Sequence, residues 1–380
     1  MKLLAKTFFG LEPALAAEWE ALGAKEIVVL KRAVLAEGDT ELLYRSNLEL
    51  RTALRILTPL AEFECPQESD FYQAVYDFPW EQYLHVDGTL AVDAVSNSEL
   101  FRHSKFLALR TKDAIVDRFR DRLGRRPNVD TDWPDLRINV HVRDRVCTLS
   151  LDSSGRSLHK RGYRASQVAA PINEVLAAGM LMEAGYPDDR PLFDPMCGSG
   201  TILTEAALMA SSSAPQLGNL NFGFQRWPDF EAGLWDRLVG EARERVHPLR
   251  QPIRGADRDG RALRSAAQNL RRCGFGAEVQ LDRADFFRQQ PPFDGGLLVM
   301  NPPYDERLGI KDIQGFYREI GATFKHRYAG YSAWIISSNF EALQAIGLRP
   351  GKKLTLFNGA LECRYLQFEL YAGSKKPSKS

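Results

Sequence analysis

An apolar run of the chain, Gly296-Leu297-Leu298-Val299-Met300, ends abruptly in Asn301-Pro302-Pro303-Tyr304. A short run that is apolar on both faces and bounded by breakers predicts a buried parallel strand. Two prolines cannot continue a central strand, so the chain must leave the sheet at this point. The sequence therefore places an amide, a rigid turn and an aromatic ring at the carboxyl edge of a sheet, where open α/β sheets bind their ligands.

These four residues suit a planar amine. The Asn301 side-chain oxygen and the Pro302 carbonyl can accept hydrogen bonds from an exocyclic NH2 group, while Tyr304 can stack on the ring that carries it. With Pro303 completing the turn, Asn301, Pro302, Pro303 and Tyr304 are the candidate catalytic residues for a nucleobase amine. Two plainer alternatives remain, a Pro-rich loop that closes a strand and a Tyr304 that packs under a cofactor.

Strands and helices alternate from Ala169 onward, which predicts a doubly wound, mostly parallel sheet. An irregular insertion is expected between Ser211 and Trp235. The expected strands are 191–193, 253–256, 279–281, 296–300 and 332–337, and the expected helices include 172–184, 200–210, 260–273 and 314–324.

A glycine loop follows the first of these strands and opens a helix. Its candidate cofactor-binding residues are Asp194, Pro195, Cys197, Gly198, Ser199, Gly200 and Thr201. The two glycines allow a tight turn and a close approach of the backbone to a ligand, and the helix start supplies free N–H groups. The loop lacks both the Gly-Lys-Ser/Thr ending of triphosphate sites and the G-x-G-x-x-G spacing of dinucleotide sites.

Two further acids follow the next two strands. Asp257 is placed to bind a ribose diol, and Asp285 can reach an adenine amine. Each acid alone could be a helix cap or a surface loop, but three in order at successive strand ends favour one nucleoside site. A ribose acid with a loop that lacks phosphate-binding features indicates S-adenosylmethionine, which carries adenosine and an amino acid but no phosphate.

The first half of the chain predicts a small α+β sandwich followed by a basic helix. Between Arg102 and Arg126 there are nine Lys or Arg residues against three Asp, although the whole chain has a net charge of only +1. Ala114, Ile115, Phe119 and Leu123 recur near helical spacing, so one face should be buried and the other basic. The face could simply be solvated, but a second basic segment, 155–164, favours an RNA-phosphate surface.

Composition limits the remaining possibilities. The five cysteines are scattered without CxxC spacing and the six histidines without HxxxH spacing, so we expect no disulfide framework, no metal and a cytoplasmic location. The longest apolar stretches are too short for a transmembrane helix, and the N-terminus lacks the apolar core of a signal peptide.

The motifs resemble a known family. Asp-Pro-Met-Cys-Gly-Ser-Gly-Thr at 194–201 and Asn-Pro-Pro-Tyr at 301–304 are similar to class I S-adenosylmethionine-dependent amino-methyltransferases. Arg161-Gly162-Tyr163-Arg164 followed by Ala170-Pro171-Ile172-Asn173-Glu174 resembles the junction of THUMP-containing RNA methyltransferases, in particular the bacterial 23S rRNA N2-guanine group.

The resemblance implies a fold and roles for further residues. It implies a ferredoxin-like domain over 1–60, a THUMP RNA-binding domain over 61–163, a Rossmann-like class I methyltransferase domain over 164–373 and a disordered tail over 374–380. It also implies that Pro171, Asn173 and Glu174 cover the methionine end of the cofactor, and that Lys160, Arg161 and Arg164 contact RNA phosphate.

The implied activity is methylation of a guanine N2 amine in 23S rRNA, with RNA as partner. Adenine-N6 methylation of RNA or DNA, guanine-N2 methylation of tRNA and a non-catalytic RNA-binding role remain open, as does the oligomeric state. The chain departs from the family at Asp305, where glycine is more usual, and its 380 residues leave no room for the second methyltransferase domain of some members.

Overall fold

The computed structural model describes residues 1–164, 172–304 and 312–373. Its contacts divide the chain into two compact units. Unit 1 comprises Met1–Thr7, Ala16–Leu158 and Asn219–Gly240, and unit 2 comprises Phe8–Leu15, His159–Gly218 and Glu241–Ser380. Residues 219–240, most of which fall in the predicted irregular insertion, thus pack with the first half of the chain rather than with the segments that flank them.

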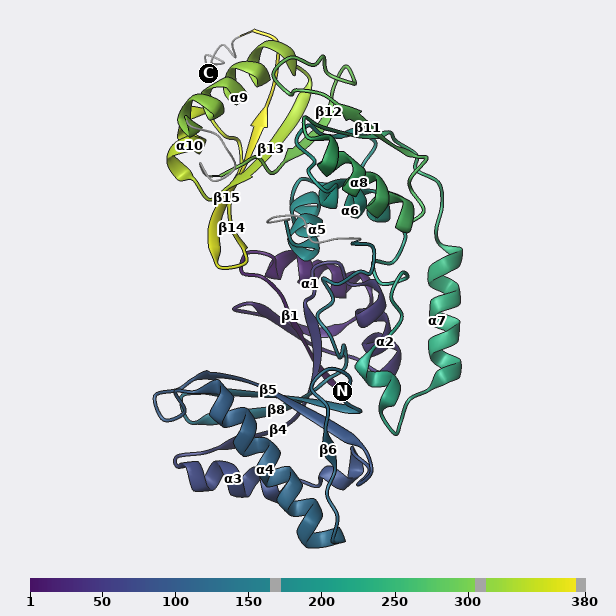
Figure 1. The fold of residues 1–380 in the computed structure, drawn as a ribbon, viewed down its shortest axis with the longest axis vertical. Helices are drawn as coiled ribbons and strands as arrows, with labels where there is room; N and C mark the ends of the chain where they lie inside the picture. Colours follow the sequence, from purple (N-terminus) through teal and green to yellow (C-terminus); the bar gives the residue numbers. More distant parts are fainter. Residues whose placement is uncertain (165–171, 305–311, 374–380) are drawn as a thin grey trace. The chain divides into compact units, whose positions relative to one another are not determined.

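An eight-stranded sheet forms unit 1 (Figure 1). In sheet order its strands are β2 (Lys25–Leu30), β3 (Ala33–Glu37), β1 (Lys2–Lys6), β4 (Arg55–Glu64), β8 (Val146–Asp152), β7 (Leu136–Arg143), β5 (Thr89–Asn97) and β6 (Asn128–Val129). Along the chain, β1 to β4 alternate with α1 (Glu12–Ala21) and α2 (Thr40–Glu49) in the order β-α-β-β-α-β, which is the ferredoxin-like arrangement.

Strand β4 was missed by the sequence analysis, and it joins the ferredoxin-like strands to the rest of the sheet. It pairs with β1 on one side and with β8 on the other. Pro59 lies inside it, and the register shifts between Pro59 and Ala61 because a proline cannot donate a ladder hydrogen bond. The predicted domain boundary between residues 60 and 61 falls within this strand.

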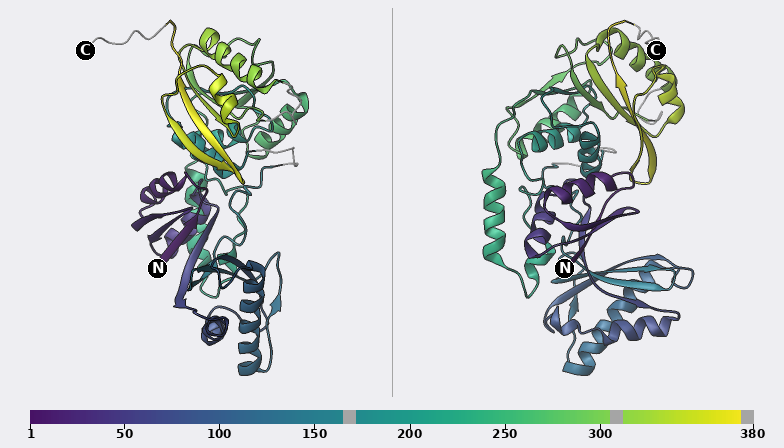
Figure 2. Two further views of the ribbon diagram at one scale, coloured as in Figure 1. Left: turned by 90° about the vertical axis from the view of Figure 1, so that its left-hand side faces the viewer. Right: turned by 180° about the vertical axis from the view of Figure 1, so that it is seen from behind.

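Two helices, α3 (Glu68–Asp77) and α4 (Ser104–Leu123), lie side by side on one face of this sheet (Figures 1 and 2). The predicted basic helix is α4, which ends at Gly124 with the positive φ of +67° that a helix terminus needs there. Ala114, Ile115 and Phe119 are buried as predicted, but Leu123 is 50% exposed. Helix α3 was missed.

The basic face of α4 is largely paired with acids, and three of these acids, Glu68, Glu81 and Asp87, lie outside the local count. Arg118 is buried and lies 2.8 Å from Glu81 of the short 3-10 helix η1 (Trp80–Gln82). Further ion pairs are Arg110–Glu68, Arg122–Glu81, Arg125–Asp87, Arg120–Asp117 and Lys112–Asp113. The surface is therefore less cationic than the helix sequence alone indicates, and Arg118 is not placed to contact phosphate.

Unit 2 contains a seven-stranded sheet. In sheet order its strands are β11 (Val279–Arg283), β10 (Ile253–Asp257), β9 (Leu192–Asp194), β12 (Gly296–Met300), β13 (Tyr331–Ser337), β15 (Leu361–Glu369) and β14 (Lys353–Asn358). The first five are parallel, and β15 and β14 are antiparallel. The prediction of a mostly parallel, doubly wound sheet is confirmed, while the β14–β15 hairpin was missed.

The strand order reverses around β9, because the chain passes from β9 to β10 and β11 on one side and then returns to β12 on the other. Such a switch point opens a crevice at the carboxyl ends of the strands. Every residue of β12 is buried, as predicted for the run before Asn301. Helix α5 (Glu174–Glu183) precedes β9, and α6 (Thr201–Ala210), α8 (Gly260–Arg272), α9 (Ile313–Arg327) and α10 (Phe340–Ala345) follow strands of this sheet. The 3-10 helix η2 (Gly223–Arg226) and most of α7 (Ala232–Glu244) belong to unit 1.

Candidate active site

The glycine loop joins β9 to α6 at the switch point. Gly198 and Gly200 have φ values of +55° and +74°, which side-chain-bearing residues rarely adopt. A Cβ on Gly200 would lie 2.9 Å from the Cβ of Ala266, so the glycine also allows α8 to pack against the loop. Asn269 of α8 donates its Nδ2 to Ser199 O at 2.9 Å and fixes the loop from that side.

Asp257, at the end of the neighbouring strand β10, is hydrogen-bonded to the same loop. Its Oδ2 accepts the Gly198 N–H at 2.9 Å, and its Oδ1 accepts the Asp259 N–H at 2.8 Å. Each carboxylate oxygen keeps a second lone pair for a ligand hydroxyl. Asp285 follows β11 and accepts the Phe287 N–H at 3.0 Å. The three predicted acids thus end or follow three neighbouring strands, β9, β10 and β11, in that order.

All of the predicted loop residues except Gly198 are buried. Asp194, Cys197 and Thr201 are each less than a tenth exposed, and burial raises the pKa of the Cys197 thiol well above its usual value. Cys197 donates its backbone N–H to Ala256 O at 3.0 Å, which ties the loop to β10. The Cys197 side chain therefore shapes the loop as a neutral thiol.

The Asp194 carboxyl is buried, and this burial, with the nearby Asp257 charge, raises its pKa well above the ordinary value of 3.8. The folded protein therefore keeps a proton that the unfolded chain has released, so stability is lost as the pH rises from 3.8 through the folded pKa. We expect Asp194→Asn to be more stable than the wild type. The gap between their free energies of unfolding should grow by at most about 1.4 kcal/mol per pH unit. Thermal unfolding without cofactor between pH 5 and pH 8 measures this gap. A constant or shrinking gap would contradict it.

The Asn301–Tyr304 turn leaves β12 directly beside the glycine loop, because β12 and β9 are paired neighbours. The Tyr304 hydroxyl donates to Asn301 Oδ1, and burial raises the pKa of that hydroxyl, so it remains a donor. The turn is fixed from two further elements. The Tyr317 hydroxyl lies 3.1 Å from Pro303 O, and Asn339 donates its Nδ2 to Tyr304 O at 3.2 Å.

This geometry modifies the predicted use of the turn. The Asn301 oxygen expected to accept an amine N–H already accepts the Tyr304 hydroxyl, so it would serve a ligand through its second lone pair. The Tyr304 ring is partly buried and directed to Asn301. Its stacking on a base stays a prediction.

Arg161 and Tyr163 belong to the interior of unit 2. Arg161 is 2% exposed, and its Nε lies 3.6 Å from Oε1 of the fully buried Glu205 on α6. Tyr163 donates its hydroxyl to the same oxygen at 2.9 Å. The prediction that Arg161 contacts RNA phosphate does not fit this burial. Its charge serves to compensate a buried carboxylate. Lys160, by contrast, is exposed.

Arg164 also has a place different from the predicted RNA surface. Its Nε donates to Glu174 Oε1 at 2.9 Å, and its Nη2 lies 3.3 Å from Ile172 O and 3.4 Å from Thr201 Oγ1. Arg164 therefore connects the first residues of α5 and α6. Its Nη1 is buried and has no hydrogen-bond partner among the described residues.

Two of the three residues predicted to cover the methionine end lie beside this arginine. Asn173 caps α5 by accepting the Val175 N–H at 2.9 Å, and Glu174 is 4% exposed. Pro171 lies outside the described residues. Sequence reasoning missed that Arg164 and Thr201 join Glu174 in one cluster. The signal available in the sequence was Glu174 at the start of a predicted helix, preceded by a loop that contains Arg164.

The site fits S-adenosylmethionine by the chemistry of its donors and acceptors. Asp257 and Asp285 present acceptors for a ribose diol and an amine. The glycine loop leaves room for a ligand at Gly198, where a Cβ would meet nothing within 4 Å. The Arg164 Nη1, which has no partner among the described residues, suits a carboxylate. Within the described ranges no cluster of three His, Cys, Asp or Glu side chains could hold a metal ion, and no helix is long and apolar enough to cross a membrane.

Comparisons with known families cover the chain in three consecutive segments. The RlmL ferredoxin-like domain matches residues 2–57, the THUMP domain matches residues 66–152, and the family described as RMKL-like, methyltransferase domain, matches residues 161–367. The predicted order of a ferredoxin-like region, a THUMP region and a class I methyltransferase domain is therefore confirmed.

Individual relatives are similar over the same extent. The ribosomal RNA large subunit methyltransferase K/L of Syntrophotalea carbinolica is 43% identical over 97% of this chain and 54% of the relative, so this chain spans about half the length of that protein. The protein slr0064 of Synechocystis sp., named as an RNA methyltransferase, is 39% identical over 95% of both chains. The crystal structure of SMU.472, described as a methyltransferase complexed with SAH, has a TM-score of 0.88 at 31% identity and 99% coverage of both chains.

The family matches, the full-length relative and the strand order with its glycine loop and Asn-Pro-Pro-Tyr turn all agree. The chain belongs to the RMKL-like methyltransferase family and carries an RlmL ferredoxin-like domain and a THUMP domain ahead of its methyltransferase domain.

Proposed function

We propose that this chain is an S-adenosylmethionine-dependent RNA methyltransferase that modifies the exocyclic N2 amine of a guanine in 23S rRNA. The observation that carries the proposal is the position of Asn301 directly after β12, beside the glycine loop that follows the paired strand β9. An amine acceptor and a nucleoside-binding loop at one switch point bring the two reactants together. The name of the Syntrophotalea carbinolica relative supports rRNA as the substrate.

The roles of the residues follow from this placement. S-adenosylmethionine, when bound, supplies a methyl group on a positively charged sulfur, which is already a strong electrophile. Asp257 would hold the ribose hydroxyls and Asp285 the adenine amine, while the loop from Asp194 to Thr201 lies against the amino-acid portion. The task that remains for the protein is to align the target amine.

The amine is the poor reactant, because the guanine N2 lone pair is delocalised into the ring. Asn301 Oδ1 and the Pro302 carbonyl would accept its two N–H groups and favour a geometry with more lone-pair character. Positive charge that develops on the nitrogen strengthens those hydrogen bonds in the transition state. No strong base is required, since the methylated nitrogen releases its proton readily to water.

The substrate is the least constrained part of the proposal, because the Asn-Pro-Pro-Tyr turn suits adenine N6 as well as guanine N2. Transfer of labelled methyl groups to unmodified 23S rRNA, tRNA, single-stranded DNA and duplex DNA, run side by side, tests it. We expect label in 23S rRNA alone. Label in tRNA alone would move the substrate, and label in DNA would contradict the proposal that RNA is recognised.

Arg164 distinguishes a cofactor role from an RNA role, and we assign it to the cofactor. Arg164→Gln removes the hydrogen bonds that link Glu174 to Thr201. It also removes the Nη1 group that has no partner among the described residues. We expect affinity for S-adenosylhomocysteine to fall by about 10–100-fold, the usual range for a charged hydrogen bond. Affinity for 5′-methylthioadenosine, which lacks the carboxylate, should change much less. Isothermal titration calorimetry measures both.

The exposed neighbour Lys160 supplies the matched control. Lys160→Gln should leave the affinity for S-adenosylhomocysteine unchanged and lower the affinity for rRNA, with a shallower dependence on salt. If Arg164→Gln binds rRNA more weakly but binds the cofactor as the wild type does, Arg164 contacts RNA rather than the cofactor.

A further inference from the structure

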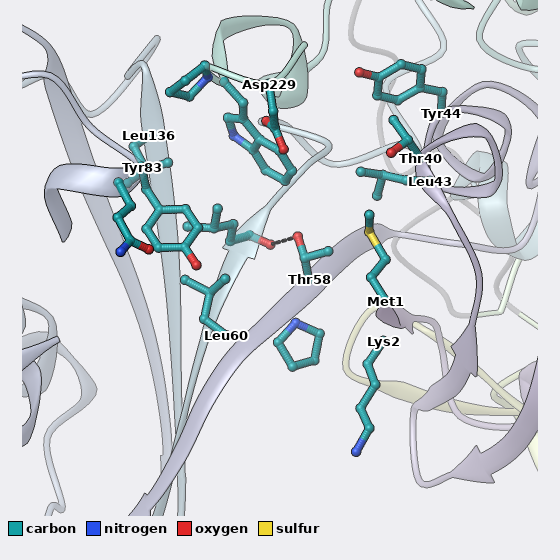
Figure 3. A pocket seen from close by; sticks show the side chains of 15 residues that line it. Met1, Lys2, Thr40, Leu43, Tyr44, Thr58, Leu60, Tyr83, Leu136 and Asp229 are labelled. Carbon is teal, nitrogen blue, oxygen red and sulfur yellow. Dashed lines mark hydrogen bonds between the residues drawn. The ribbon is translucent and has the colours of Figure 1, made fainter. Parts of the chain in front are cut away.

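A cavity of about 280 Å³ opens within unit 1, and none of the residues assigned to methyl transfer lines it. Three segments that are distant in sequence line it: the ferredoxin-like part, the THUMP part and the 227–229 segment that returns from the second half of the chain. Figure 3 shows Tyr83, Asp229 and Tyr44 arranged around the space, with Thr58 and Leu60 of β4 on its floor. The lining is mostly apolar, and it includes the rings of Tyr44, Tyr83 and Trp227.

Three polar groups of the lining residues have no hydrogen-bond partner in the described part of the chain, whereas the Tyr44 and Thr58 hydroxyls are paired. The Trp227 Nε1 is buried and has no hydrogen-bond partner in the described part of the chain. Likewise the Tyr83 hydroxyl and the Asp229 carboxylate make no hydrogen bond to any described residue, although Asp229 is exposed. Unsatisfied buried donors are rare in folded proteins and call for a partner. The indole N–H is enclosed by the protein, but a ligand with donors at its edge would pair with the Asp229 carboxylate and the Tyr83 hydroxyl, whose residues line the cavity.

The charge of the lining argues against a phosphate. Among the described side chains around the cavity only that of Lys2 is cationic, and Asp229 would repel an anion. The size is near the lower end of the ligand-pocket range, which begins at about 300 Å³. A flat, polar-edged ring fits these limits better than a whole nucleotide or cofactor.

We propose that this cavity binds an unpaired nucleobase of the RNA substrate, at a second site that is separate from the base to be methylated. Sequence-specific RNA recognition takes splayed-out bases into aromatic pockets and reads their edges by hydrogen bonds. Here Trp227 and Tyr83 supply the aromatic surface, and the Tyr83 hydroxyl and the Asp229 carboxylate supply the edge contacts. The inference rests on the RNA substrate of the proposed function.

Binding of unmodified 23S rRNA to the full chain over a range of salt concentrations tests the inference. Because stacking is not electrostatic, Trp227→Leu should weaken binding by about 5–150-fold, the range for one stacked base, with an unchanged salt slope. Trp227→Phe keeps one aromatic ring against the core and removes the pyrrole part of the indole, so it should weaken binding about 3–10-fold through the smaller stacking surface. Asp229→Asn, on an exposed residue, changes the edge contact without a risk to folding.

Trp133 provides the matched control, because it is 45% exposed in the same unit and does not line the cavity. Trp133→Leu should bind rRNA as the wild type does, and all four variants should bind S-adenosylhomocysteine equally well. Wild-type affinity for rRNA in both Trp227→Phe and Asp229→Asn would overturn the inference and leave the cavity to another occupant. No rRNA binding by the wild type itself would instead overturn the proposed function, and this inference with it.

Discussion

Replacement of Asn301 by alanine should lower kcat for methyl transfer by about 10²–10³-fold, the usual cost of one hydrogen-bond acceptor or donor that acts on the developing charge. Asn301 is the side-chain acceptor of the turn that leaves β12 beside the glycine loop. In the proposed mechanism its contact with the amine strengthens as the nitrogen becomes positive, so the loss should appear in kcat rather than in KM. Single-turnover methylation with saturating rRNA measures it.

Tyr304→Phe is the matched control for this prediction. It removes the hydroxyl that occupies Asn301 Oδ1 and retains the ring. We expect kcat within about tenfold of the wild type, because the amide oxygen that contacts the amine remains. Affinity for S-adenosylhomocysteine should be unchanged in both variants. An Asn301→Ala protein with wild-type kcat, or one that only loses cofactor affinity, would show that Asn301 does not act on the amine.

The second large effect concerns stability. Glu205→Ala leaves the buried Arg161 without its carboxylate and removes the acceptor of the Tyr163 hydroxyl. Removal of one partner of a buried ion pair typically costs about 3–5 kcal/mol, because the remaining charge stays buried. We therefore expect the free energy of unfolding of unit 2, measured by urea denaturation, to fall by about that amount.

A double variant separates this cost from the loss of packing. Arg161→Met with Glu205→Leu removes both charges and should recover most of the stability that Glu205→Ala loses, because apolar replacements of buried pairs are often neutral. Tyr163→Phe should cost only about 1–3 kcal/mol. If Glu205→Ala is as stable as the wild type, the Arg161–Glu205 pair does not support the fold as described.

The most predictable part of the chain was the edge of the parallel sheet. A run such as 296–300 can be apolar at every position only if both faces are buried, and the prolines after it fix where the strand ends. The glycine loop and Asp257 followed from the same reasoning, because the carboxyl ends of parallel strands share one edge. Hydrogen bonds such as Asp257 to Gly198 needed the structure.

Two missed elements had signals that were overlooked or misleading. Gly359-Ala360 is the two-residue loop between β14 and β15, and a glycine with a positive φ at the first position of such a loop is a hairpin signal. Strand β4 was concealed by Pro59, which normally argues against a central strand but is accommodated here by a register shift.

Charge was the least predictable property. Arg161 looked like a phosphate ligand because it lies in a basic segment, yet its partner Glu205 comes from α6, more than forty residues later. The acids opposite α4, such as Glu81 and Glu68, come from the missed helix α3 and the turn after it. Sequence counts of local charge cannot include partners that only the fold brings near.

The identity of the methylated nucleoside tests the central claim most directly. Unmodified 23S rRNA is incubated with the full chain and S-adenosylmethionine, digested to nucleosides and analysed by mass spectrometry, with Asn301→Ala in parallel. The geometry at Asn301 and the rRNA-directed relatives predict N2-methylguanosine that is absent from the variant reaction. N6-methyladenosine in its place, or N2-methylguanosine that persists in Asn301→Ala, would contradict the proposed reaction.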